Sequence, residues 1–228
     1  HVVPDMLLGV NIVVLPLLDA VVLANQVATL SRLSGERFVL GVGVGGNEAE
    51  FERLGSDFAN RGLRADEAIE VMRRLWREER ADFKGQFHNL TDMAIYPRPR
   101  TGHPPLWIGG SSTAAIDRAA RVGDAWAPAL VDPQALGKGV ARLRQGLSGR
   151  PMISVATAEF VHPSRPFDEA KADRVHVAGT PAERIATLDE YQEGGLEHLV
   201  CHFVASGMDE QLHHMRFFST EVMPHFAE

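Results

Sequence analysis

The sequence has little cysteine and no excess of positive charge, and each shortage excludes a class of protein. Its single cysteine, Cys201, excludes an internal disulfide framework and a zinc site built from cysteines, and it favours a reducing compartment. The 23 lysine and arginine residues stand against 30 aspartate and glutamate residues, so the formal net charge is −7. A nucleic-acid or anionic-membrane partner requires clustered positive charge. We therefore expect neither partner, and no metal site.

Long hydrophobic runs are also missing. No apolar run approaches the roughly 20 residues needed to cross a bilayer. Residues 1–10 have neither the basic stretch nor the cleavage site of a secretory signal. We therefore expect a cytoplasmic protein. Hydrophobic residues nevertheless make up 45% of the 228 positions, which is enough to form a sizeable core.

Short apolar stretches alternate with longer segments of helical period, the pattern of parallel strands joined by crossover helices. Most of the short stretches are apolar at consecutive positions, as expected for strands covered on both faces. This pattern predicts an α/β fold. The six predicted strands are Leu7–Leu15, Phe38–Val44, Leu106–Ile108, Ala125–Pro128, Ile153–Phe160 and His198–Val204. The predicted helices are Asp19–Leu33, Arg61–Arg77, Ser112–Val122, Thr180–Gly194 and Asp209–His225. Phe83–Pro99 is expected to be a short hairpin or an extended segment on the surface.

Two helix starts carry local signals. Asp19 is a suitable N-cap for the first helix, and Thr180 followed by Pro181 is a suitable start for the fourth. Neither a repeat nor a change in composition marks a linker, so we expect one domain over residues 1–228.

Glycines follow the strand that begins at Phe38, and Gly41, Gly43 and Gly46 satisfy the pattern G-x-G-x-x-G. In a dinucleotide-binding fold, an acidic residue should end a second strand about 20 residues later. Here the acidic residues at 66 and 67 fall within a predicted helix. The alternative is that small residues are required where a tightly packed strand turns, and we prefer it.

A second signal follows the strand at Leu106. It ends in Gly109 and Gly110, and Ser111 and Ser112 then open a predicted helix. The free backbone N–H groups and the dipole of a helix N-terminus favour a phosphate. The alternative is an ordinary serine N-cap. Because an N-cap needs neither two glycines nor a second hydroxyl, we favour a phosphate site.

Several motifs in order resemble those of the bacterial luciferase-like flavin and deazaflavin oxidoreductases. A strand ending L-G-V-G-x-G is followed by an acidic residue, an arginine before a long helix and a terminal L-W pair. The motifs P-P-[IL]-W-I-G-G-S-S, A-A-R-x-G-D-x-W, G-T-P-x-E and G-G-x-[DE]-H-L then follow. The matching positions are Leu40–Gly45, Glu50, Arg61, Leu75–Trp76, Pro104–Ser112, Ala119–Trp126, Gly179–Glu183 and Gly194–Leu199.

The resemblance implies a luciferase-like (β/α)8 TIM barrel with cofactor and substrate at the C-terminal ends of its strands. It implies the deazaflavin coenzyme F420 as cofactor, with FMN as the alternative, and both carry a phosphate. Deazaflavin members have a bulged strand with a non-proline cis peptide behind the ring, which corresponds to Asn11-Ile12. The implied phosphate contacts are Gly109, Gly110, Ser111 and Ser112, and the implied ring contacts are Val44, Gly45 and Gly46.

One position departs from the family pattern. Some deazaflavin sugar-phosphate dehydrogenases have a catalytic glutamate where this sequence has Gly46. This departure argues against that substrate class. We expect Glu50 to be structural and to pair with Arg61.

The start of the sequence carries the one catalytic candidate. His1 resembles a histidine that relatives present to the cofactor pocket at the end of their second strand; the alternative is a tag remnant without a role. Only about five residues precede the next predicted strand, fewer than the ~10–12 that a parallel crossover needs. With six strands predicted where a barrel has eight, we expect that the sequence omits a strand–helix–strand segment and the helix after His1. A second omission is considered between Phe160 and Gly179.

These observations predict an oxidoreductase or monooxygenase that acts on a small organic substrate, with hydride transfer or oxygen activation at the cofactor ring. We also expect a homodimer. A non-catalytic binding or partner subunit of the same fold is the main alternative. A nicotinamide-binding Rossmann enzyme is a third, and a strand in place of the helix Arg61–Arg77 would favour it.

Overall fold

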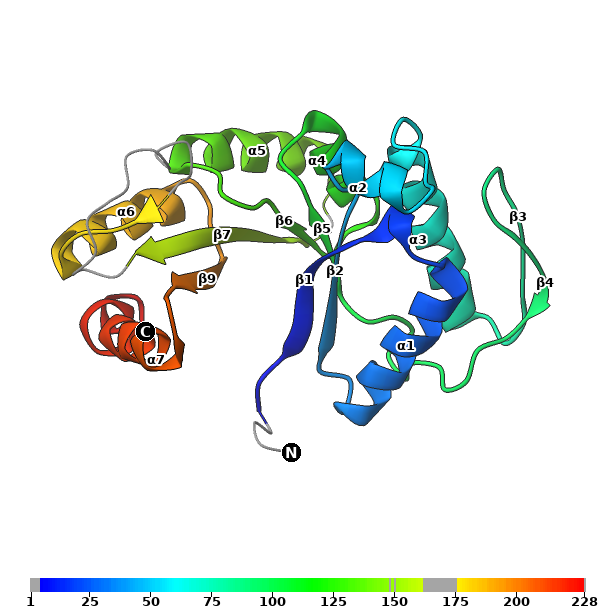
Figure 1. Cartoon of the computed structure of the whole chain (residues 1–228), viewed down its shortest axis with the longest axis horizontal. Helices are drawn as coiled ribbons and strands as arrows, with labels where there is room; N and C mark the ends of the chain where they lie inside the picture. Colours follow the sequence, from blue (N-terminus) through cyan, green and yellow to red (C-terminus); the bar gives the residue numbers. More distant parts are fainter. Residues whose placement is uncertain (1–4, 148, 150, 162–175, 228) are drawn as a thin grey trace. The chain divides into compact units, whose positions relative to one another are not determined.

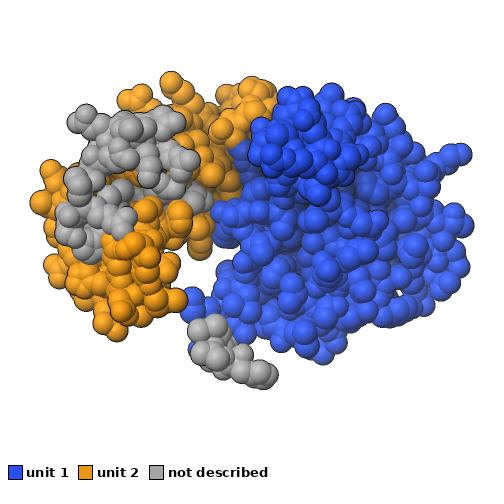
Figure 2. Space-filling model, in the orientation of Figure 1, with its two compact units in different colours: residues 1–110, 122–125 blue, residues 111–121, 126–228 orange. Residues whose placement is uncertain are grey.

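The computed structural model describes residues 5–147, 149, 151–161 and 176–227. Strands and helices alternate along the chain, as predicted (Figure 1). The residues group into two compact units (Figure 2), unit 1 with residues 1–110 and 122–125, and unit 2 with residues 111–121 and 126–228. The expectation of a single domain stays a prediction.

Unit 1 is built on three parallel strands in the order β1 (Leu8–Val14), β2 (Phe38–Gly43) and β5 (Leu106–Gly109). All six residues of β2 are buried, which agrees with a strand covered on both faces. β1 is exposed over its first five residues and pairs with β2. The central strand therefore forms the core of this sheet.

Two helices of unit 1 pack against each other, α1 (Ala20–Leu33) and α3 (Arg61–Arg77). The carboxylate of Asp19 accepts hydrogen bonds from two backbone amides in the first turn of α1, at 2.9 Å each, which confirms the predicted cap. The indole Nε1 of Trp76 donates to the backbone oxygen of Ala24 at 2.9 Å and joins the helices. Because residues 61–77 are helical, the strand that a Rossmann enzyme requires is not present in this segment.

Of the two alternatives for Phe83–Pro99, the hairpin is observed, and it lies slightly earlier: β3 (Ala81–Lys84) and β4 (Asn89–Met93) pair antiparallel. A single carboxylate, Glu67 of α3, holds its turn and is only 13% exposed. This carboxylate accepts from the backbone N–H groups of Gln86 (2.8 Å), Phe87 (2.7 Å) and His88, and lies 3.0 Å from Nδ1 of His88. Glu67 therefore ties the hairpin to α3.

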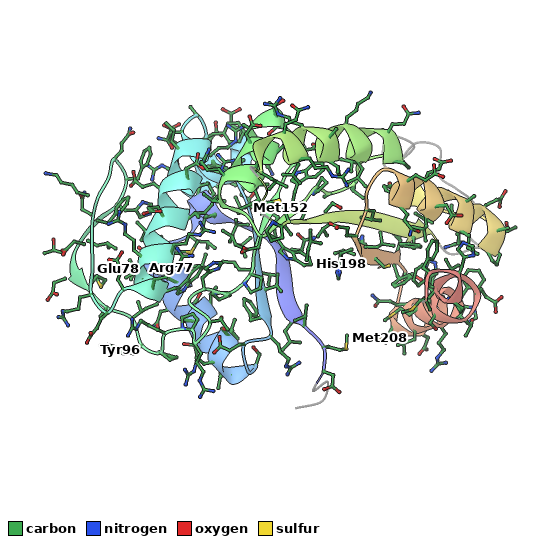
Figure 3. The ribbon with its side chains drawn as sticks, turned by 180° about the vertical axis from the view of Figure 1, so that it is seen from behind. Arg77, Glu78, Tyr96, Met152, His198 and Met208 are labelled. Carbon is green, nitrogen blue, oxygen red and sulfur yellow. The ribbon has the colours of Figure 1, made fainter. Side chains whose placement is uncertain are left out.

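The segment after the hairpin returns to the end of α3. Figure 3 labels Arg77 and Glu78 at that end and Tyr96 in the returning segment. Nη1 of Arg98 donates to the backbone oxygen of Arg77 at 3.3 Å. This hydrogen bond connects the segment to α3 shortly before β5 begins.

Unit 2 contains a second set of parallel strands, in which β7 (Ile153–Val161) pairs with β8 (His176–Val177) and with β9 (His198–Val204). α6 (Pro181–Glu193) begins with the predicted signal: Thr180 and Glu183 form a reciprocal capping box. The remaining elements of unit 1 are η1 (Leu15–Leu17) and α2 (Glu48–Arg53). The other elements of the chain are α4 (Thr113–Val122), β6 (Ala125–Ala127), α5 (Pro133–Gly146), α7 (Met208–Phe217), η3 (Phe218–Val222) and η4 (Met223–Phe226).

Three differences from the predicted elements stand out. The helix α5 and the short strand β8 were not predicted. The last helix, predicted over Asp209–His225, ends as an α-helix at Phe217 and continues as a π-helical and a 3-10 turn. Within the described part of the chain, none of the helices is long and apolar enough to span a bilayer.

Replacement of Glu67 by glutamine should loosen the hairpin. An amide has one acceptor oxygen where the carboxylate has two, so it cannot accept all of these hydrogen bonds, and at least one donor in the turn loses its partner. We expect the free energy of unfolding to fall by about 1–3 kcal/mol, measured by urea denaturation at pH 7. The matched control is Glu70→Gln on the same helix, where an exposed pair with Arg74 is lost and the change should stay below about 0.5 kcal/mol.

The stability difference between the wild type and E67Q should also depend on pH. Burial alone would raise the pKa of Glu67, but the hydrogen bonds from Phe87, His88 and Gln86 outweigh it and lower the pKa below its ordinary value. A lowered folded-state pKa stabilises the fold above the unfolded-state pKa, and this contribution is lost as pH falls through the folded-state pKa. The difference should therefore shrink between pH 7 and pH 3. A constant difference would contradict this role.

Candidate functional site

The predicted ring-binding residues gather at one edge of the sheet in unit 1. β1, β2 and β5 are parallel, and their ends are in register, with Val14 beside Gly43 and Val42 beside Ile108. The turns that follow these strands therefore leave the sheet at the same edge, where open α/β sheets and barrels bind ligands.

The strand β1 has the predicted irregularity. The peptide bond Asn11-Ile12 is cis. The register with β2 shifts between Val10 and Val13, because three steps along β1 match two steps along β2. One extra residue in β1 makes this a bulge. Both features of the expectation, the cis bond and the bulge, are confirmed.

Glycines of the neighbouring strands make room for this bulge. A Cβ atom at Gly41 would collide with the carbonyl oxygen of Val10 and lie 3.0 Å from Cγ2 of Ile12. A Cβ atom at Gly43 would lie 2.6 Å from Cδ1 of Ile12, and one at Gly109 would lie 3.0 Å from its Cγ2. Ile12 thus lies across glycines of two strands. This packing accounts for Gly41 and Gly43 of the glycine pattern, which agrees with the preferred structural interpretation.

The turn after β2 is stabilised by contacts of Gly45 with Val14, Phe51 and Arg61. Gly45 has φ +78°, and a Cβ atom there would lie 2.6 Å from Cγ1 of Val14 and 2.9 Å from the ring of Phe51. Nε of Arg61 donates to the backbone oxygen of Gly45 at 3.2 Å. The expected ion pair between Arg61 and Glu50 is wrong: among the described ion pairs there is none between them, and Glu50 is exposed on α2. The guanidinium of Arg61 binds the backbone of the glycine turn instead.

The outer side of this turn is open. Gly46 is exposed, and a Cβ atom there would have no heavy atom within 4 Å. Val44 and Gly45 are half-buried beside it. Ile12 keeps 37% of its surface exposed. Backbone and a small apolar surface are therefore accessible here, as a flat ring requires.

The turn between β5 and α4 begins with Gly109 and with Gly110, whose φ is +107°. Ser111 and Ser112 follow and are exposed. Oγ of Ser112 accepts from the backbone N–H of Ala115 at 3.2 Å, so Ser112 is the N-cap of α4. A capping hydroxyl still has its own proton to donate. The two interpretations of this turn are therefore compatible.

Two further observations concern the predicted motif residues. His1, the catalytic candidate, lies outside the described residues. Asp124 has a structural role: its Oδ2 accepts from the N–H of Leu106 at 2.8 Å, and its own N–H donates to the backbone oxygen of Leu106 at 2.8 Å. The aspartate of the G-D-x-W motif thus holds the first residue of β5.

Unit 2 contains an apolar pocket of about 580 Å³, bordered by β9, α6 and the C-terminal helical turns. His198 of β9 (Figure 3), Cys201 and Phe203 are among the residues that line it. Burial raises the pKa of the Cys201 thiol to about 12, so the thiol is protonated at neutral pH. None of the residues predicted to bind the cofactor lines this pocket.

Comparison with known proteins identifies the family. The family model of luciferase-like monooxygenases matches residues 4–195, and the chain belongs to this family.

A protein of Mycobacterium tuberculosis is 36% identical over 131 residues, which are 58% of this chain and 45% of that protein. An F420-dependent glucose-6-phosphate dehydrogenase of Amycolatopsis mediterranei is 29% identical over 251 residues, 89% of this chain and 74% of that enzyme. An FMNH2-dependent dimethylsulfone monooxygenase of Pseudomonas putida is 33% identical over 105 residues, 44% of this chain and 29% of that enzyme. The chain thus spans about half the length of the mycobacterial relative.

Solved structures agree on the fold. A monooxygenase from Streptomyces bottropensis matches with a TM-score of 0.85 at 22% identity, over 97% of this chain and 78% of that chain. An F420-dependent secondary alcohol dehydrogenase matches with a TM-score of 0.83 at 18% identity, over 97% of this chain and 80% of that chain. The predicted fold class, luciferase-like α/β of the TIM-barrel type, is confirmed.

A methyl group at Gly41 should disturb the bulge. Gly41→Ala places a Cβ atom against the carbonyl of Val10, which cannot rotate away as a side chain would. We expect a loss of about 1–3 kcal/mol in the free energy of unfolding, measured by urea denaturation. Gly46→Ala is the control, because a Cβ atom there meets nothing, and it should change stability by less than about 0.5 kcal/mol. Equal stability of the two variants would contradict the packing of Ile12 described above.

Proposed function

We propose that the chain is an F420-dependent oxidoreductase that transfers a hydride between the cofactor and a small organic substrate. The observation that carries the proposal is the accessible backbone at Gly46, in the turn that follows β2 at the C-terminal edge of the sheet. A side chain at Gly46 would occupy this surface, whereas glycine allows a planar ring to approach the backbone. Ile12, which packs against Gly43 at the end of β2, keeps 37% of its surface exposed.

The β5–α4 turn supports the phosphate end of the same proposal. Two exposed hydroxyls, those of Ser111 and Ser112, stand at the N-terminus of a ten-residue helix, where the helix dipole favours an anion. Gly110 adopts the left-handed backbone that leads into this turn. We infer that this turn binds the cofactor phosphate and that residues 44–46 support the ring.

The chain's own residues would bind and orient the cofactor, and the reduced deazaflavin would supply the hydride when bound. Gly46 lets the ring approach the backbone, and Ile12 presents an apolar surface that excludes water on one side. His1 remains our candidate for holding a proton near the ring.

F420 is favoured over FMN by the extent of the similarity. The A. mediterranei enzyme, which is F420-dependent, aligns with 89% of this chain, whereas the FMNH2-dependent enzyme of P. putida aligns with 44%. We do not extend the glucose-6-phosphate substrate to this chain, because Gly46 replaces the catalytic glutamate that the resemblance places there. FMN remains the second candidate.

The cofactor can be identified by titration of the 228-residue chain with F420, FMN and riboflavin, monitored by absorbance and fluorescence. We expect saturable binding of F420 that is tighter than binding of FMN, and weaker binding of riboflavin than of FMN because riboflavin lacks the phosphate. If neither F420 nor FMN binds, the enzyme proposal fails and the non-catalytic subunit is favoured.

The phosphate site has its own test. Ser111→Ala removes a hydroxyl that can donate to the phosphate, and should weaken F420 binding about 10- to 100-fold, since a hydrogen bond to a charged group contributes about 1.5–3 kcal/mol. The matched control is Ser206→Ala, an exposed serine that precedes the ten-residue helix α7 without a pair of glycines. It should leave F420 affinity unchanged. Equal affinities of both variants and the wild type would exclude Ser111 from the phosphate site.

A further inference from the structure

The side chain of Arg61, at the first position of α3, connects that helix to the glycine turn of β2. Its Nε donates to the backbone oxygen of Gly45 at 3.2 Å, and its Nη1 donates to the backbone oxygen of Phe58 at 2.9 Å. One guanidinium thus links the turn after β2 to the loop that precedes α3. The fixed fork geometry of arginine suits two carbonyl groups at once.

Aromatic side chains hold this guanidinium in place. The Cζ atom of Arg61 lies 3.7 Å from the centroid of the Phe58 ring, a cation–π contact. Phe58 in turn packs edge-on against Phe51, with 5.2 Å between the ring centroids. Phe51 is fully buried and borders Gly45 on the side where a Cβ atom would stand. Phe51, Phe58 and Arg61 therefore form a support beneath Gly45.

We propose that Arg61 is a positioning residue that fixes the turn 44–46 in the conformation that accepts the cofactor ring. Its effect on cofactor binding rests on the function proposed above, whereas its effect on the turn does not. Gly45 adopts a left-handed backbone conformation, but a glycine populates other backbone regions as easily. Gly45 by itself therefore does not fix the conformation of the turn. The hydrogen bond from Arg61 selects one of these conformations before any ligand binds. Such preorganisation improves affinity without a direct contact.

A neighbouring arginine provides a matched control. Arg64 lies on the same helix and also stacks on a phenylalanine, with its Cζ 4.5 Å from the centroid of Phe87. Its Nε donates to Oδ1 of Asn60 at 2.7 Å, and no hydrogen bond to Gly45 is among the described contacts of Arg64. Arg64→Gln therefore removes the same charge and a similar stacking contact, while the glycine turn keeps its support.

The first experiment measures hydrogen–deuterium exchange of the unliganded chain. Arg61→Gln should raise amide exchange in residues 43–47 about tenfold, which corresponds to about 1.4 kcal/mol of lost local stability. Exchange in α1 serves as the internal reference and should stay unchanged. Arg64→Gln should change exchange in 43–47 less than twofold. If R61Q and R64Q have equal effects on this segment, or if R61Q accelerates α1 to the same degree, the proposal is overturned.

Two further variants separate positioning from overall folding. Arg61→Lys keeps the charge but loses the fork, and should fall between the wild type and R61Q. Gly45→Ala disturbs the turn from the other side, because its Cβ atom would meet Val14 and Phe51. Since both changes act on one turn, the double variant R61Q/G45A should show less than the sum of the two effects on exchange. Strict additivity would show that Arg61 and Gly45 act independently.

The second experiment measures F420 affinity. R61Q should weaken binding about tenfold, and R64Q should leave it unchanged. If the wild type binds neither F420 nor FMN, the proposed function fails, and the exchange experiment still decides whether Arg61 fixes the turn. If the wild type binds and R61Q binds equally well, the positioning role fails and the proposed function stands.

Discussion

The packing of Ile12 across the glycines of β2 and β5 is the constraint on which the candidate site depends. A Cβ atom at Gly41, Gly43 or Gly109 would intrude on the bulge of β1. Because these positions lack side chains, the bulge fits against β2 and β5 while the parallel pairing on either side of it is preserved. Part of Ile12 remains exposed, and the residue packs against Gly43, which directly precedes the turn that we assign to the cofactor ring.

Several residues of the family motifs form hydrogen bonds to the backbone in this chain. Arg61 holds the oxygen of Gly45, Asp124 holds the first residue of β5, and Ser112 caps α4. Each forms a hydrogen bond with a backbone N–H or C=O group near the start or end of β2, β5 or α4, the elements that carry the site. What remains available to a ligand is accessible backbone at Gly46 and exposed hydroxyl groups such as that of Ser111. The protein therefore prepares a shaped surface, and the proposed cofactor would carry the redox chemistry.

The helix α5 shows why part of the fold could not be predicted. It contains glycines at 137, 139 and 146, and glycine is a poor helix former. The structure explains Gly139: a Cβ atom there would collide with the ring of the buried Trp126. The glycine that weakens the helical signal is thus required by a contact with a residue distant in sequence. The two-residue strand β8 is too short to carry an alternating pattern, and it exists through its pairing with β7.

Local physical chemistry explains what the sequence by itself determined. Helical periodicity and the caps at Asp19 and Thr180 act over a few residues, and they located most helices, while short runs of consecutive apolar residues located most strands. The family motifs added the barrel class and the position of the bulge. Only the tertiary structure decided the partner of Arg61, because a guanidinium can bind a carboxylate or a carbonyl with similar geometry. Folding placed the oxygen of Gly45 within reach of Arg61 and left Glu50 exposed. Arg61 and Gly45 are 16 residues apart in the chain, so the fold selected this contact, and no property of either residue alone predicts it.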